Sequence, residues 1–280
     1  MGHVLMDQVR VAAKGPFDHR AALEVLVAHA VAGVDLIEGG TFVRLVEVDG
    51  VPRPVSITLD EQGALVGSDD ASVVERVRYW FDLDTDLGPI NDHLAADPVF
   101  TADVEARPGL RITRFADPFA ATCMTIVGQQ VSLAAARLFT SRLVAAWAEG
   151  EIDGLRPFPS PRTIAATPVD DLRASIGLTN ARAATLQATA RLWADIADEG
   201  RSPTRAELAG VKGIGPWTLD YLAIRVADDP DSFPAADAVL KRRLRELCVD
   251  DSARVANWSP WRSYAASRLW SMPSSAVSGS

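Results

Sequence analysis

Strand-forming patterns are confined to the first third of this chain. Four runs rich in Val, Leu and Ile, with turn residues between them, predict the strands of a small antiparallel sheet. They span residues 8–14, 41–48, 53–59 and 64–67. Two helical segments, 18–32 and 70–81, would cover one face of that sheet, with Asp18 and Asp70 as their N-caps.

After Pro89 the strand patterns stop, and apolar residues recur at helical spacing. Two predicted helical faces carry Phe119, Cys123, Ile126 and Val127, and Phe139, Leu143, Ala146 and Trp147. The Ala-rich run 180–197 predicts a third helix. We therefore expect an α+β N-terminal domain over residues 1–86 and a mainly helical region over residues 87–280, in which two helical subdomains face each other across a cleft. The Ser-rich tail, residues 274–280, is expected to be disordered.

Length and composition favour a folded protein without a membrane anchor. With 280 residues, of which 48% are apolar, the chain can bury a full core. No uninterrupted apolar run approaches the roughly 20 residues that a membrane helix needs, and the first ten residues lack the apolar core of a secretory signal. We expect a cytoplasmic protein. A monomer is expected because one active cleft per chain suffices.

The cysteines and histidines give no sign of a metal. Cys123 and Cys248 are too few for a disulfide framework or for a four-thiolate iron-sulfur cluster. Both are expected to be small buried hydrophobes. The four histidines show no metal-ligand spacing. The sequence therefore predicts no metal and no cofactor.

Charge is unevenly placed along the chain. The formal net charge of −9 argues at first against a polyanionic partner. The acidic excess lies in residues 1–110, which carry a net charge of −11, whereas residues 201–280 carry +2. A surface formed by the later residues can therefore still be locally basic, and nucleic acid is not excluded as a partner.

A glycine-rich stretch at residues 208–221, LAGVKGIGPWTLDY, predicts the end of a short helix, a hairpin and a second helix. Gly213 and Gly215 allow backbone conformations that other residues resist, and Pro216 suits a first helical position. The amides around both glycines would point outward at a helix N-terminus, where unpaired donors and the helix dipole favour a phosphate. A purely structural turn uses the same residues and is the commoner outcome.

A lone acid, Asp237, follows 16 residues after this stretch and stands directly before a helical run at 238–247. An aspartate in that place is commonly an N-cap. The cap is compatible with a catalytic role, because backbone donors and the helix dipole hold the carboxylate ionised in a fixed place.

The hairpin and its spaced aspartate resemble the helix-hairpin-helix and Gly/Pro-rich loop of the HhH-GPD family of DNA base-excision glycosylases. Within that family the chain is most similar to the alkylbase glycosylases of the DNA-3-methyladenine glycosylase II type. The resemblance includes segments at 117–138, 177–192 and 258–270 and covers most of the chain. It implies a partner, duplex DNA that contains alkylated bases.

The resemblance also implies how the reaction proceeds. In the family, the aspartate at the position of Asp237 stabilises the positive charge that builds on the sugar as the N-glycosidic bond breaks, and it can orient the attacking water. Trp217 stands where bifunctional relatives such as endonuclease III place a nucleophilic lysine. Without an amine no Schiff base with the sugar can form. We therefore expect a monofunctional glycosylase that leaves an abasic site and does not cut the strand.

Three aromatic residues, Trp217, Tyr221 and Trp270, fall on positions that resemble the walls of the family's base pocket. Purines alkylated at N3 or N7 are cationic, and an electron-rich ring attracts such a cation by roughly 0.5 to 2 kcal/mol. Most buried aromatic residues are simply part of a core, and for Trp270 the two interpretations compete closely.

Two glutamines, Gln129 and Gln130 in IVGQQVS, stand where the family inserts a side chain into the gap left by the extruded nucleotide. The best-known members have an apolar wedge where this chain has Gln130, and a polar wedge can hydrogen-bond the orphaned opposite base. Gln129 can equally cap or brace the loop. Lys212 would meet a phosphate or be an ordinary exposed lysine. The hairpin residues of the expected DNA-binding set are Lys212, Gly213, Ile214 and Gly215.

The sequence thus favours a base-excision repair enzyme that hydrolyses the N-glycosidic bond of alkylated purines with Asp237. The alternative from another class is a non-catalytic module that uses the same hairpin to bind damaged DNA, with Asp237 only a cap. A glycosylase for oxidised bases or mismatches is a further rival, disfavoured because Trp217 replaces the lysine.

Overall fold

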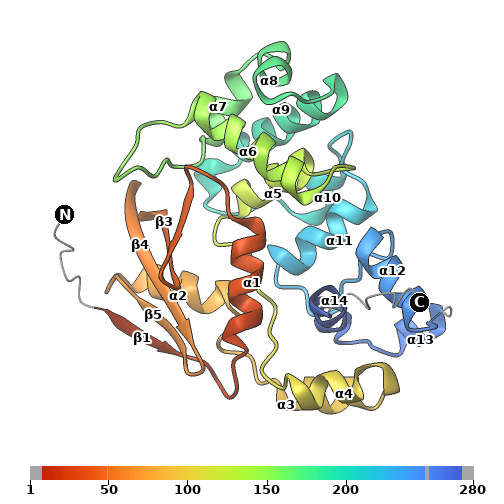
Figure 1. The fold of residues 1–280 in the computed structure, drawn as a ribbon. Coiled ribbons are helices and arrows are strands. Elements are labelled where there is room, and N and C mark those ends of the chain that lie inside the picture. Colours follow the sequence, from red (N-terminus) through yellow and green to blue (C-terminus); the bar gives the residue numbers. More distant parts are fainter. Residues whose placement is uncertain (1–7, 49, 250–251, 273–280) are drawn as a thin grey trace, which may run out of the picture.

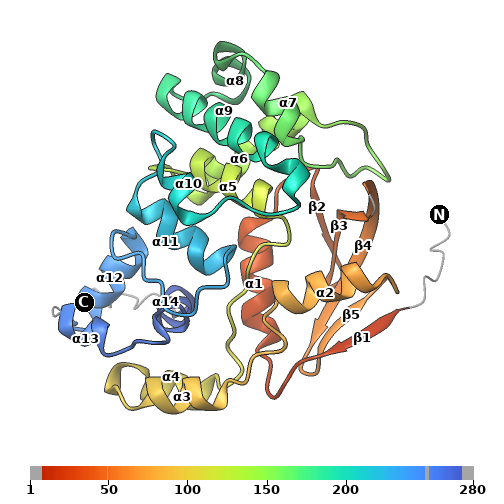
Figure 2. The same ribbon diagram turned by 180° about the vertical axis from the view of Figure 1, so that it is seen from behind.

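A five-stranded sheet with its helices forms one side of the molecule, and the other helices form the rest (Figures 1 and 2). The computed structural model describes residues 8–48, 50–249 and 252–272. The strands are β1 (Val9–Ala12), β2 (Asp35–Glu38), β3 (Thr41–Val48), β4 (Val51–Asp60) and β5 (Gly63–Val66). All neighbours pair antiparallel, in the order β1-β5-β4-β3-β2.

The sheet buries its apolar side chains together with α1 (His19–His29) and α2 (Ala71–Trp80). Ile57 of β4 lies opposite Phe42 of β3 on one side and opposite Val66 of β5 on the other. Because paired residues in a sheet point to the same face, the three side chains form one row, and this row is buried with residues of both helices.

The two helices begin where the sequence predicts. Asp18 accepts a hydrogen bond from the amide of Ala21, and Asp70 accepts one from the amide of Ser72, so both N-caps are confirmed. The strand that the sequence did not reveal is β2. It has four residues with an acid at each end and lies at the sheet edge, which is too short a run to show alternation.

The rest of the described chain is helical. Its helices are α3 (Gly88–Ala95), α4 (Pro98–Ala106), α5 (Pro118–Val127), α6 (Leu133–Trp147), α7 (Pro161–Ala166), α8 (Val169–Ile176), α9 (Asn180–Asp195), the 3-10 turn η1 (Ala197–Glu199), α10 (Arg205–Ala209), α11 (Pro216–Arg225), α12 (Ala238–Glu246), α13 (Ser252–Ala256) and α14 (Arg262–Ser271). Within the described residues no helix is both long enough and apolar enough to cross a membrane.

The helical region holds two apolar cores. One gathers buried residues of α5 to α9 and of the α10–α11 hairpin, and the other gathers residues of α3, α4, α12 and α14. Helix α11 lies between them, since its Leu222 belongs to the first core and its Ile224 to the second. The predicted arrangement of two helical subdomains agrees with this division.

One predicted burial, that of Cys248, is wrong, and one residue of a predicted apolar helical face is exposed. Ala146 is exposed, because the buried face of α6 runs through Thr140, Leu143 and Val144 instead. Cys123 is buried as expected, and burial raises the pKa of its thiol. Cys248 is exposed, in a left-handed backbone conformation (φ 54°) directly after α12 and its cap. The predicted disordered tail, 274–280, lies outside the described residues.

The boundary between the two regions follows from packing. Leu87, Ile90 and Phe100 share a core with Trp258 and Leu269 of the C-terminal helices, not with the sheet. We therefore propose that the sheet domain ends near residue 86. The chain then returns toward the sheet through residues 107–117, where it bridges both regions.

A buried polar network joins the sheet domain to the last helix. Asp82 and Arg114, both 4% exposed, form an ion pair with Nη1 and Oδ1 3.1 Å apart. The Tyr264 hydroxyl of α14 donates to Oδ2 of Asp82 over 2.9 Å. Burial raises the pKa of Tyr264 well above its ordinary value. Nε of Arg114 is the one donor of this network without a partner in the described part of the chain, and the remaining bonds fix the relative position of the elements that they join.

Candidate active-site cleft

A cleft of about 630 Å³ opens between α1 on one side and α11 and α14 on the other. Figure 1 shows α1 standing between the sheet and these two helices, and Figure 2 shows the same from behind. Helices α5, α6 and α12 also contribute to its wall. Four residues predicted from the sequence line this one space: Trp217, Tyr221, Asp237 and Trp270.

Asp237 is the N-cap of α12, as predicted, and it is held by four donors. Its Oδ1 accepts from the amides of Val239 (2.9 Å) and Leu240 (3.0 Å) and from the indole Nε1 of Trp270 (3.1 Å). Among the residues that the structure describes, its Oδ2 accepts only from the indole Nε1 of Trp217, over 3.0 Å. Within the described residues, Oδ2 therefore keeps acceptor capacity that Oδ1 does not.

The three aromatic rings form a continuous surface. Trp217 stacks on Tyr221 with centroids 5.5 Å apart and planes 24° apart, and Tyr221 meets Trp270 edge to face at 5.7 Å. Burial raises the pKa of Tyr221, so its hydroxyl stays protonated at neutral pH. Both tryptophans thus wall the cleft and orient Asp237 at once. Trp270 fits both interpretations from the sequence, because it packs against Tyr221 and also lines the cleft.

Arg225 is a cleft residue that the sequence analysis missed. It is 6% exposed, and its Cζ lies 4.9 Å from the ring centroid of Trp270 and 5.8 Å from that of Tyr221. The protein's own cation therefore occupies part of the electron-rich surface that we expected a cationic base to use. Arg225 lies one helical turn beyond Tyr221, so helical spacing could have placed it on the same face of α11.

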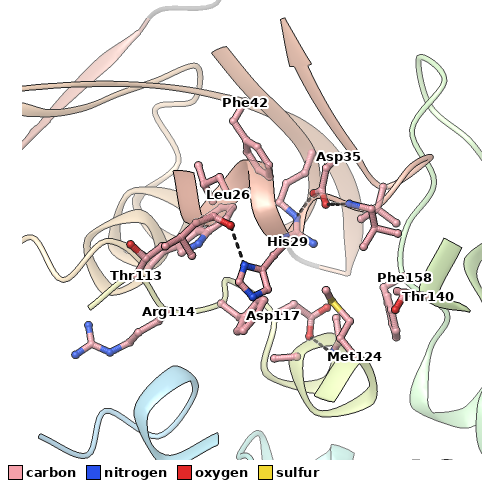
Figure 3. A pocket seen from close by; sticks show the side chains of 18 residues that line it. Leu26, His29, Asp35, Phe42, Thr113, Arg114, Asp117, Met124, Thr140 and Phe158 are labelled. Atoms are coloured by element: carbon pink, nitrogen blue, oxygen red, sulfur yellow. Dashed lines mark hydrogen bonds and ion pairs between the residues drawn. The ribbon is translucent and has the colours of Figure 1, made fainter. Parts of the chain in front are cut away.

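His29 is the second missed residue, and it enters the cleft from the sheet domain. Figure 3 shows it on α1, beside a small cavity that it also lines with Met124 and Asp117. Its Nδ1 lies 2.9 Å from the carbonyl oxygen of Val25. Burial, and then the nearby charge of Arg225, lower its pKa to about 4, so the ring is neutral at physiological pH. No motif marks it, because it is remote in sequence from Asp237 and from the three aromatic residues of the cleft.

The lowered pKa of His29 predicts a loss of stability in acid. The unfolded chain binds a proton at His29 below about pH 6.5, whereas the folded chain does so only near pH 4. The free energy of unfolding should therefore fall between these values, by up to about 3 kcal/mol. Urea unfolding at pH 7 and pH 4.5 measures this, with His29→Phe as the comparison. If both proteins lose the same stability, His29 is not responsible.

The predicted hairpin joins α10 to α11. Gly213 has a φ of 99°, as expected, but Gly215 is the N-cap of α11 with a φ of −102°, which any residue adopts. The conformational argument for Gly215 is therefore wrong. A side chain at Gly215 would meet nothing within 4 Å, so the backbone there is open to a ligand. Within the described residues, the amides of Lys212, Gly213 and Gly215 donate to no protein group.

Ile214 differs from its neighbours in the hairpin. Its amide donates to the carbonyl oxygen of Val211 over 3.1 Å, and its side chain is buried in the first helical core. Ile214 therefore shapes the hairpin and offers neither a free donor nor an exposed side chain. Lys212 is exposed, and its carbonyl oxygen accepts from Thr185 Oγ1 over 2.9 Å.

The loop between α5 and α6 lies against this hairpin. Gln129 Nε2 donates to the carbonyl oxygen of Gly213 and to Thr218 Oγ1, each over 3.1 Å. The bracing role considered for Gln129 is thus present. Gln130 is exposed, with a φ of 57°. These residues lie outside the lining of the cleft, but the contacts of Gln129 place them at the N-terminus of α11, whose next turns carry Trp217 and Tyr221.

Comparison with known proteins agrees with this layout. The sequence model of the AlkA N-terminal domain matches residues 8–117, and that of the HhH-GPD superfamily base excision DNA repair protein matches residues 123–256. A protein of Mycobacterium tuberculosis named "Probable bifunctional transcriptional activator/DNA repair enzyme AlkA" is 32% identical over 94% of this chain. This chain spans 56% of that relative's length. A DNA-3-methyladenine glycosylase of Bacillus subtilis is 30% identical over 71% of each chain.

Two solved structures share the fold. The 3-methyladenine DNA-glycosylase from Archaeoglobus fulgidus superposes with a TM-score of 0.79 at 18% identity, over 95% of this chain and 97% of that one. The 8-oxoguanine glycosylase/lyase of Clostridium acetobutylicum, in complex with double-stranded DNA, gives 0.67 at 17% identity, over 85% of this chain and 87% of that one.

Proposed function

The chain belongs to the HhH-GPD superfamily of base excision DNA repair proteins, and on that premise we propose that it is a monofunctional DNA glycosylase for alkylated purines such as 3-methyladenine and 7-methylguanine. The observation that carries the proposal is the fixed carboxylate of Asp237 in a cleft walled by Trp217, Tyr221 and Trp270. A module that only binds DNA has no need of a carboxylate held in an aromatic pocket.

The reaction follows from the charge that develops on the sugar. As the N-glycosidic bond breaks, its electron pair leaves with the base and C1′ becomes electron-poor. Asp237 stabilises that positive charge, and the spare acceptor capacity of Oδ2 suits a water that attacks C1′. A purine alkylated at N3 or N7 is cationic in DNA and departs as a neutral base. The leaving group therefore needs no proton donor in the cleft.

Binding of the DNA would use the hairpin and the neighbouring loop. The free amides of Lys212, Gly213 and Gly215, next to the N-terminus of α11, fit a backbone phosphate. Gln130 would fill the gap that the extruded nucleotide leaves, and its exposure at the turn between α5 and α6 supports this role. We propose that the protein acts as a monomer on duplex DNA.

Base release from methylated duplex DNA tests the proposal. The purified protein is expected to liberate free 3-methyladenine and 7-methylguanine, which chromatography separates from the polymer. Tight binding of the damaged duplex without release would support the non-catalytic module instead. Release of oxidised purines alone would point to the rival glycosylase class.

The absence of strand cleavage is a separate expectation. Because Trp217 offers no amine to the sugar, the product should be an intact strand with an abasic site. Electrophoresis of an end-labelled duplex should show breaks only after treatment with alkali. Breaks before alkali, together with a covalent complex trapped by borohydride, would show that another amine serves as nucleophile.

A further inference from the structure

Arg225 brings an unpaired hydrogen-bond donor to the cleft. The residue is 6% exposed, and one guanidinium nitrogen donates to the carbonyl oxygen of Thr113. Its Nε, also buried, has no partner within the described residues. A buried donor without a partner is costly to maintain, and such groups call for an explanation. Arg225 lines the cleft, but Nε itself has no exposed surface there, so a ligand can supply the missing acceptor only when the side chain turns toward it.

His29 brings the complementary acceptor. A carbonyl oxygen can only accept, so the contact between Nδ1 and Val25 places the ring hydrogen on Nδ1. The lone pair of the neutral ring is then on Nε2, which makes no hydrogen bond within the described residues. In Figure 3 the Nδ1 contact turns back toward α1, and Nε2 is at the opposite side of the ring. His29 and Arg225 line the same cleft as Asp237.

We propose, on the basis of the function above, that His29 and Arg225 select the extruded base by its edge: Nε2 of His29 accepts from an N–H of the base, and Arg225 turns so that its Nε donates to an adjacent base acceptor. The preferred substrates are damaged purines that keep an N–H beside an acceptor. Adenine offers its amino group beside a ring nitrogen, and guanine offers N1–H beside O6. 3-Methylpurine, the analogue of 3-methyladenine without the amino group, has no such N–H.

The positive charge of the base is a weaker basis for selection than the hydrogen-bonding groups on its edge. The guanidinium of Arg225 already lies over Tyr221 and Trp270, so it weakens the attraction of these rings for a second cation. A site whose buried polar groups expect a hydrogen-bond partner rejects analogues that lack it, because the protein groups are then left unpaired. The sheet domain, through His29, would thus take part in choosing the base.

The test compares two lesions in duplex oligonucleotides, 3-methyladenine and 3-methylpurine, in single-turnover base release. Both are cationic in DNA, and only 3-methyladenine carries the amino N–H. His29→Phe keeps an aromatic ring to pack against Phe115 but removes the acceptor. It is expected to slow release of 3-methyladenine about tenfold, with 3-methylpurine release unchanged within about twofold. His29→Gln, whose side-chain oxygen can replace Nε2 as acceptor, should restore most of the difference between the release rates of the two lesions. Equal slowing of both lesions, or of neither, would overturn the role of His29.

Binding of the free bases gives a readout that does not depend on catalysis. Quenching of the protein's tryptophan fluorescence, to which Trp217 and Trp270 contribute from the cleft wall, is measured with 3-methyladenine and with its 1-deaza and 7-deaza analogues. At least one analogue should bind about tenfold more weakly, because the acceptor for Arg225 is gone. Unchanged affinity for both analogues would refute the role of Arg225. If no base is released but free 3-methyladenine binds in a His29-dependent way, the proposed enzymatic function is wrong, whereas the proposed recognition of the base edge by His29 is supported.

Discussion

Replacing Asp237 with asparagine is expected to slow base release by about a hundredfold or more while the protein stays folded. Asparagine caps helices as well as aspartate does, so the amides of Val239 and Leu240 keep a partner. What is lost is the negative charge next to the sugar, together with the acceptor for the Trp217 indole, because an amide nitrogen replaces Oδ2. The measurement is the single-turnover rate of 3-methyladenine release, with thermal unfolding to confirm the fold.

Asp70→Asn serves as the matched control. Asp70 is also the N-cap of a helix, α2, but it is only partly buried and lies outside the cleft. The same chemical change there should leave base release within about twofold of the parent. A parent-like rate for Asp237→Asn would remove the assigned mechanism, and Asp237 would then be only a helix cap.

Gly213→Ala is expected to have the second largest effect, on folding and on DNA binding together. A Cβ at Gly213 would lie 2.1 Å from Oγ1 of Thr185, and that hydroxyl is itself held by Ala181 and Lys212. The left-handed backbone at φ 99° adds strain for any side chain. Together these effects should lower the free energy of unfolding by about 3 kcal/mol. Urea unfolding measures the stability, and fluorescence anisotropy with a labelled duplex measures affinity.

Gly215→Ala separates the two effects, because its backbone suits alanine and its Cβ would meet nothing. The free energy of unfolding should stay within about 0.5 kcal/mol of the parent. Affinity for duplex DNA should still fall severalfold, since the methyl group would stand where a phosphate approaches the amide. Parent-like affinity would mean that the DNA backbone does not bind at this end of the hairpin.

Sequence reasoning found those cleft residues that lie in or near one continuous motif. Trp217 and Tyr221 belong to the hairpin helix, and Asp237 is marked by its place before α12. Trp270 needed the family resemblance. His29 could not be found, because only tertiary packing brings α1 to α11, and local patterns carry no information about that contact. Arg225 could have been predicted from its helical spacing to Tyr221, but a charged residue late in a helix is ordinarily solvated.

The fold shows the same limit. Strand and helix patterns located the sheet domain and the change to helices, since both depend on local periodicity. The four-residue edge strand β2 and the exposed Ala146 were not predictable, because neighbouring elements decide which face is covered. The conformation of Gly215 is a comparable case. Its backbone is unstrained and open to approach, and the sequence does not distinguish such a glycine from one that a turn requires.

The ion pair of Asp82 with Arg114, and the bond from Tyr264, lie where the sheet domain meets the last helix, outside the cleft lining. They fix the distance between the two walls of the cleft, because α1 is one wall and belongs to the sheet domain, and α14 is part of the other wall. A small change in this junction would alter the width of the cleft opening, with every contacting group intact. Under the proposed function, the range of bases that enter the cleft is therefore open to evolutionary adjustment from a distance.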